Sequence, residues 1–166
     1  MNTRPGLLTQ FTTDYLQDNR LIQLARKLIG FVNCWLAPGF DLAMRLYIAS
    51  VFLRSGWIKI SNWDSTLYLF ANEYHVPLLP PDFAAVMGTA GELGLPVLLV
   101  LGLTGRFAAV GLSVLNLVAA VSFPDISDLG LQDHVLWGTM LLMLVLHGCG
   151  RFSIDHWLLR EPCYKS

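Results

Sequence analysis

The sequence predicts an all-α membrane protein: a four-transmembrane-helix bundle with N- and C-terminal amphipathic interfacial helices. Two observations lead to this class. Only 14% of the 166 residues are charged, whereas soluble domains carry about 25%. Four apolar runs, at 42–60, 83–103, 107–123 and 131–149, each approach the roughly 17–25 residues that a spanning helix needs. A soluble helical protein is the alternative, but four such runs leave too little polar surface to solvate it.

The chain divides into three predicted parts. Residues 1–38 form a cytoplasmic tail and an amphipathic interfacial helix, 39–150 the four-helix membrane domain, and 151–166 a cytoplasmic interfacial segment. From Asp14 to Leu36, apolar residues recur at helical spacing among basic and polar ones. This pattern predicts a helix that is too polar to span and lies among lipid headgroups. We expect Pro38-Gly39 to break it and to turn the chain into the membrane.

The connections between the apolar runs contain further predicted elements. Aromatic and apolar residues at steps of three and four predict a short interfacial helix within 63–75. The prolines that follow lead into the second run, which begins near Asp82. Residues 103–106 predict a tight turn between the second and third runs. After the fourth run, residues 151–160 predict another interfacial helix, with Ser153 as its N-cap.

Basic residues lie on one side of the predicted bundle, which sets its orientation. Eight of them flank the first and fourth runs or lie in the turn between the second and third: Arg4, Arg20, Arg26, Lys27, Arg106, Arg151, Arg160 and Lys165. The opposite connections and the run ends beside them hold six acidic residues, and Lys59 is the basic residue there. The basic side is cytoplasmic, so we expect a multi-pass protein of the bacterial inner membrane with both termini inside. The net charge of −1 gives no indication of a nucleic-acid partner.

Polar residues inside the apolar runs are the candidate site. A rise of about 1.5 Å per residue places Arg54 about 9 Å, Asn116 about 10 Å, Glu92 about 14 Å and His134 about 5 Å below the outer surface. Charged groups at such depths are expensive and need partners. We therefore expect an Arg54–Glu92 ion pair, supplemented by Asn116 and His134. A structural role, fixing the register of the helices, is the alternative to a functional one.

Other polar residues have simpler interpretations. Arg45 and His147 are expected to form a second polar layer near the cytoplasmic end, and Lys59 to extend outward to the surface. A metal site at the acidic outer face is conceivable, but no ligand spacing supports it, so we assign no metal. The three cysteines form no Cys-x-x-Cys pair, which argues against a disulfide-exchanging enzyme. No motif for a nucleotide, a haem or another electron carrier is present.

The ordered polar motifs resemble the DoxX family of small bacterial membrane proteins. The resemblance extends from about Asp41 to Asp155. Its motifs are Arg45-Leu, Arg54-Ser-Gly56-Trp-Ile-Lys59, Glu92-Leu, Gly102-Leu-Thr-Gly-Arg106 and His147-Gly-Cys149-Gly150-Arg151. Cys149 stands where many members have proline. The resemblance implies a four-helix membrane protein, and it links some members to thiosulfate:quinone oxidoreduction and others to oxidative stress or metal-peptide maturation.

The functional expectation joins this resemblance to the polar residues. We expect an accessory subunit of a membrane redox system, binding a quinone near Arg54, Glu92, Asn116 and His134. Since no electron-carrying motif is present, we do not expect an autonomous enzyme. The partners are expected to be membrane lipid and either another protein or further copies of the chain. The alternative function is a membrane anchor or transport component in metal or oxidative-stress handling.

Overall fold

The computed structural model describes residues 20–148 and 153–154, and the regular elements among them are all helical. Contacts along the backbone divide the chain into two compact units, Met1–Gly39 and Phe40–Ser166. Four helical segments in the described part are long and apolar enough to cross a membrane: Ile22–Ser61, Pro81–Leu101, Gly105–Ser122 and Asp128–His147. The four predicted spans are therefore confirmed to within a few residues, except that the first helical segment begins earlier.

In the first unit, α2 (Arg20–Phe31) is followed by a π-helical turn, η1 (Val32–Leu36), and then by the start of α3 (Ala37–Ser61). The predicted break at Pro38-Gly39 is wrong. In a regular helix the ring of Pro38 would clash with the carbonyl four residues earlier. The π turn, in which the Ala37 N–H bonds to the Val32 carbonyl, widens the backbone just before the proline, so the helix continues.

The predicted terminal amphipathic helices are only partly covered by the described residues. Helix α2 and the π-helical turn η1 together cover residues 20–36 of the expected N-terminal helix, and its expected start at Asp14 lies outside the described residues. That α2 lies at the membrane interface stays a prediction. The expected C-terminal helix also lies outside them, apart from Ser153 and Ile154.

The second unit contains the rest of α3 and then α4 (Trp63–Asn72), α5 (Pro81–Leu101), α6 (Gly105–Ser122) and α7 (Asp128–His147). Their boundaries follow local chemistry. The side chains of Asn62 and Ser127 accept hydrogen bonds from backbone N–H groups at the starts of α4 and α7. Pro81 occupies the first position of α5, where its missing N–H costs nothing. Gly102 and Gly148, both with positive φ, end α5 and α7.

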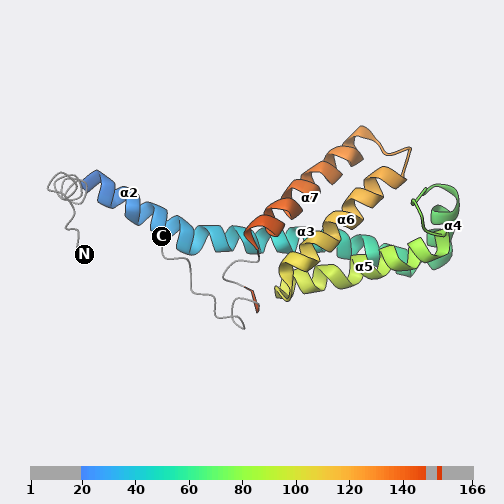
Figure 1. The fold of residues 1–166 in the computed structure, drawn as a ribbon, viewed down its shortest axis with the longest axis horizontal. Coiled ribbons are helices and arrows are strands. Elements are labelled where there is room, and N and C mark those ends of the chain that lie inside the picture. Colours follow the sequence, from blue (N-terminus) through green and yellow to red (C-terminus); the bar gives the residue numbers. More distant parts are fainter. Residues whose placement is uncertain (1–19, 149–152, 155–166) are drawn as a thin grey trace, which may run out of the picture. The chain divides into compact units, whose positions relative to one another are not determined.

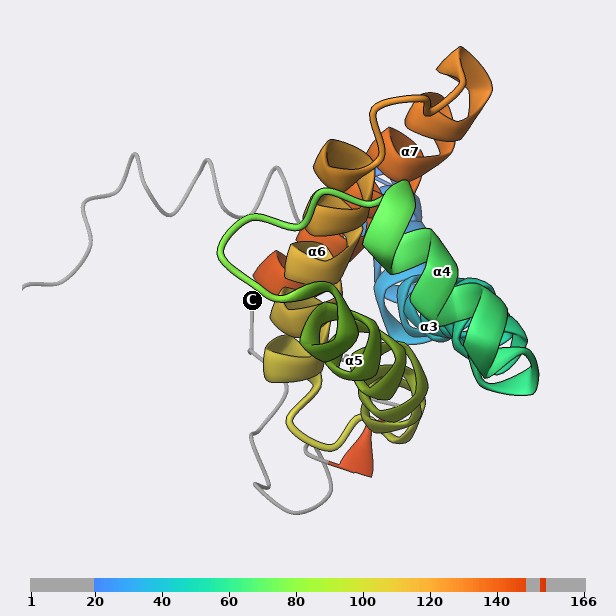
Figure 2. The ribbon, with the colours of Figure 1, turned by 90° about the vertical axis from the view of Figure 1, so that its right-hand side faces the viewer.

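The spanning helices alternate in direction, so the bundle has two ends. We call the end at which α3 and α6 finish and α5 and α7 begin the distal end, and the opposite one the proximal end. Figure 1 shows α6 and α7 side by side as an antiparallel pair, and Figure 2 shows α5 beside α6 in an end-on view. At the distal end the His75 N–H donates to the Ser122 carbonyl over 2.8 Å, which joins the α4–α5 connection to the end of α6.

The main core lies among α3, α5, α6 and α7. Its buried members are apolar: Met44, Ile48, Phe52, Leu99, Ala108, Ala109, Leu112, Leu141 and Leu144. Glycines allow α5 and α6 to approach closely, because a Cβ on Gly91 would lie 2.7 Å from the Leu115 side chain and one on Gly111 equally close to Leu95. Such small-residue contacts are typical of helix packing in lipid. Helix α5 continues through the buried Pro96, so its internal proline does not end the span.

Candidate polar site in the membrane bundle

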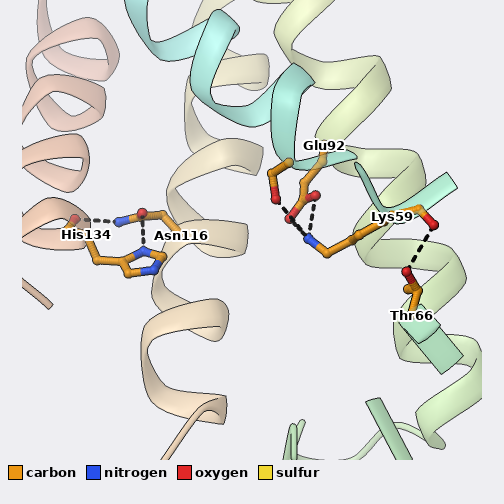
Figure 3. Close-up of polar contacts among 6 residues, drawn as sticks. Lys59, Thr66, Glu92, Asn116 and His134 are labelled. Carbon is orange, nitrogen blue, oxygen red and sulfur yellow. Dashed lines mark hydrogen bonds and ion pairs between the residues drawn. The ribbon is translucent and has the colours of Figure 1, made fainter. Parts of the chain in front are cut away.

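Glu92 is 8% exposed, near the middle of α5. Its carboxylate is bound by the ammonium group of Lys59 on α3, with Nζ 2.5 Å from Oε1 and 2.6 Å from Oε2 (Figure 3). Lys59 Nζ also donates to Ser55 Oγ over 3.1 Å. Two sequence predictions are therefore wrong: Arg54 does not pair with Glu92, and Lys59 extends into the bundle instead of outward.

The helical positions on α3 explain this exchange of partners. A Cβ on Gly56 would lie 2.9 Å from Leu93 and 3.1 Å from Glu92, so this face of α3 lies against α5. Lys59 is three residues after Gly56 and lies on the same face. Arg54 is two residues before Gly56 and points to the opposite side of the helix. Its side chain is accordingly exposed.

A second polar pair joins α6 to α7. Asn116 is 6% exposed, and its Nδ2 donates to the backbone carbonyl of His134 over 2.8 Å. The Asn116 Oδ1 atom lies 2.8 Å from His134 Nδ1 (Figure 3). Asn116 and His134 therefore do meet, as expected. In the described part of the chain, no hydrogen bond or ion pair connects this pair to Lys59 and Glu92, so the four predicted residues do not form a single cluster.

The geometry of Asn116 determines which nitrogen of His134 carries a proton. The carbonyl of residue 134 can only accept a hydrogen bond, so the amide nitrogen of Asn116 must face it. The amide oxygen then faces Nδ1, which must donate. Neutral His134 consequently holds its proton on Nδ1 and has a free lone pair on Nε2. Asn116 thus orients a half-buried histidine with an available basic nitrogen.

Trp137 is a neighbour of His134 that the sequence prediction missed. The rings of His134 and Trp137 meet edge to face with centroids 5.1 Å apart, and Trp137 also contacts Phe52 of α3 at 6.4 Å. The indole Nε1 is buried and has no hydrogen-bond partner among the residues that the structure describes. A spacing of three residues places His134 and Trp137 on one helix face, which is the signal that identifies the tryptophan from sequence.

Arg45 and His147, the expected second polar layer, lie in different environments. Arg45 is fully buried, and its guanidinium lies beside Gly102 and Ser153, where a Cβ on Gly102 would approach both. His147 is exposed at the end of α7, with Nδ1 3.3 Å from the Met143 carbonyl. Arg45 is thus part of the packing at the proximal end, whereas His147 lies on the surface.

Tyr74 lies outside the spans at the distal end, and the charge of the buried Glu92 carboxylate affects its pKa. Its ring stacks on Phe70 with centroids 4.9 Å apart and contacts Phe123 at 5.3 Å. Burial raises the pKa of the Tyr74 phenol above its ordinary value of 10.0, and the charges of Glu92 and Glu73 raise it further. An open pocket of about 450 Å³ lies beside this ring. None of Arg54, Glu92, Asn116 or His134 lines it.

The acidic and histidine residues at the distal end do not converge. Within residues 20–148 and 153–154, no three His, Cys, Asp or Glu side chains are placed to hold a metal ion together. The polar features described there are a buried ion pair and an asparagine-oriented histidine. Chemically, the histidine can accept a proton from a ligand, and the ion pair fixes α3 against α5.

The comparisons with known proteins give one family. The model of the DoxX family matches residues 40–125. An uncharacterized protein of Haemophilus influenzae is 30% identical over 123 residues, which cover 69% of this chain and 80% of that protein. No solved structure matches the chain. The matched region includes Lys59, Glu92 and Asn116 and ends before α7.

Proposed function

The chain belongs to the DoxX family, and we propose that it serves as an accessory subunit of a quinone-linked redox system in the bacterial inner membrane. One observation carries this proposal: Asn116 holds His134 in the tautomer that has a basic Nε2. A quinol has two O–H groups and a quinone two carbonyl oxygens, so a histidine that accepts a proton suits the reduced form.

The surroundings of His134 support a lipid-soluble ligand. Helix α7 is covered by the rest of the chain over only 11% of its most apolar segment, compared with 33% for the other three. A ligand dissolved in the bilayer therefore reaches this helix directly. The Trp137 ring next to His134 offers an apolar surface, and rotation of its half-buried side chain presents the Nε1–H donor to a carbonyl oxygen.

The proposed site differs from the sequence prediction in its members. Asn116 and His134 remain, and Trp137 is added. Glu92 is neutralised by Lys59 and acts structurally, and Arg54 lies on another surface. The chain supplies a binding site and a proton acceptor, while a partner supplies the electron carrier. We also propose the orientation with both termini in the cytoplasm, because eight basic residues flank that side.

Bound quinone tests this function. The protein is purified in nanodiscs of native lipid, and quinone is extracted and quantified per chain. We expect wild type to retain quinone, and Asn116→Leu and His134→Phe to lose most of it. Trp57→Phe is the matched control, because Trp57 is exposed on α3. Equal quinone content in wild type, His134→Phe and quinone-free lipid blanks contradicts the proposal. A stable co-purifying protein without quinone instead supports the anchor or transport function.

A further inference from the structure

Two charged side chains lie exposed within the spans. In the described parts of α3, α5, α6 and α7, Arg54 and Asp133 are the exposed charged residues more than one turn from a helix end. Arg54 precedes the end of α3 by seven residues, and Asp133 follows the start of α7 by five. These separations correspond to roughly 10 Å and 8 Å along the helices. In the described part of the chain, neither side chain has a hydrogen bond or an ion pair, and Asp133 interacts electrostatically with the adjacent His134.

Such charges are costly when they face lipid. An aspartate has a short stem and cannot extend to the headgroups, unlike a lysine or an arginine. Intramembrane charges are almost always paired or face a cavity. Asp133 therefore requires a cationic partner, and exposed Arg54, which has no ion pair in the described part of the chain, is a cation available for this role. The Lys59–Glu92 ion pair shows the solution that this protein uses inside its own bundle.

Arg54 and Asp133 lie at matching depths. Both lie near the distal ends of their helices, Arg54 roughly 10 Å before the end of α3 and Asp133 roughly 8 Å after the start of α7. The long arginine side chain covers the difference easily. One chain thus presents a cation and an anion at nearly one level but on different helices.

We propose that a second copy of this chain docks on these helices, with Arg54 of each copy bound to Asp133 of the other. A two-fold symmetric contact presents the same surfaces on both copies, so it pairs both charges of each copy and leaves none over. The neighbouring surface suits close helix packing. Exposed Ser50 is one turn from Arg54, and exposed Leu129 and Leu136 flank Asp133 on α7.

Charge reversal gives a test in which the two variants complement each other. Copies with two different tags are co-expressed, and recovery of one tag with the other is measured in nanodiscs. Arg54→Glu places two carboxylates together in its own dimer, and Asp133→Arg places two guanidinium groups together. We expect each variant alone to lose self-association more than about tenfold. An Arg54→Glu copy mixed with an Asp133→Arg copy restores both ion pairs, so the mixture should associate like wild type.

The control is Asp125→Arg, which reverses an exposed acid in the α6–α7 connection and should leave association unchanged. The proposal is overturned if each variant self-associates like wild type, or if the folded variants fail to associate when mixed. A wild type that is monomeric with bound anionic lipid also overturns it, because a lipid phosphate then neutralises Arg54.

Cross-linking keeps the proposal testable if charge reversal prevents folding. Arg54→Cys and Asp133→Cys copies, each with the native cysteines replaced by serine, are mixed and treated with a short bis-maleimide. We expect a cross-linked dimer from the mixture, and much less from Arg54→Cys mixed with Asp125→Cys. Equal yields from the two mixtures contradict the proposed contact.

Discussion

Removing one member of the Lys59–Glu92 ion pair is expected to destabilise the bundle, because it leaves a buried charge without its partner. Replacing Lys59 by Met leaves the buried Glu92 carboxylate without the ammonium group that binds it. Removing one member of a buried pair typically costs about 3–5 kcal/mol. The Lys59 side chain is 20% exposed and that of Glu92 11%, so some water reaches the pair and we expect the lower end of this range, about 3 kcal/mol.

A double-mutant cycle isolates this contribution. Lys59→Met and Glu92→Leu are measured singly and together, by denaturation in mixed micelles followed by tryptophan fluorescence. The double variant should lose much less stability than the two single losses combined, because it removes both charges, and we expect a coupling of at least about 2 kcal/mol. Arg54→Met is the matched control and should be additive with Glu92→Leu. Additivity for Lys59, or strong coupling for Arg54, would refute the assigned pairing.

Three further outcomes are expected. Gly56→Ala should destabilise the protein by about 1–3 kcal/mol in the same denaturation assay, because its Cβ would lie 2.9 Å from Leu93. Gly94→Ala, with no atom within 4 Å, should be neutral or slightly stabilising. Tyr74 should ionise above pH 10 in an absorbance titration, since its pKa is raised, and Glu73→Gln should lower its midpoint. Because its pKa is raised on folding, the contribution of Tyr74 to the free energy of unfolding is fully present below pH 10 and is lost as the pH rises above it. Tyr74→Phe should therefore reduce the loss of stability at alkaline pH. An unchanged loss would show that another group causes it. Reporter fusions after Leu79 and Asp128 should be periplasmic and those after Gly105 and Ser166 cytoplasmic; the reverse pattern would invert the bundle.

The spans were predictable from sequence because length and hydropathy alone determine whether a helix can cross a bilayer. The short helix after the first span was predictable for a similar local reason, and so was the turn between the second and third spans, which was expected at 103–106 and begins at Gly102. The partner of Glu92 was not. The expected depth in the membrane placed Arg54 within reach of Glu92, but pairing also depends on the direction in which a side chain leaves its helix. The spacing Gly56-x-x-Lys59 indicates this direction, because the glycine lies on the face at which α3 approaches α5.

The break expected at Pro38-Gly39 failed for a different reason. Proline disrupts a helix by clashing with the preceding turn, and the sequence rule assumes that this turn is a regular α-helical one. Here the preceding turn, Val32–Leu36, is a wider π-helical turn, so the rule does not apply and the helix continues. Trp137 was overlooked because an aromatic residue in an apolar run is usually part of the packing. Its spacing of three residues from His134 indicates a shared helix face, and its Nε1, which has no hydrogen-bond partner among the described residues, distinguishes it in the structure.

The position of Arg45 has a consequence for biosynthesis. Arg45 belongs to the first span, yet its buried guanidinium lies beside Gly102 and Ser153, and Ser153 follows the fourth span. The ribosome adds about 5–20 residues per second, so the roughly 110 residues between Arg45 and Ser153 take on the order of 5–20 s to synthesise. During that interval the first span has left the ribosome with a charged residue whose final surroundings do not yet exist. The guanidinium must therefore be solvated by water or lipid headgroups in the meantime, and it becomes enclosed only when the residues after the fourth span reach the proximal end.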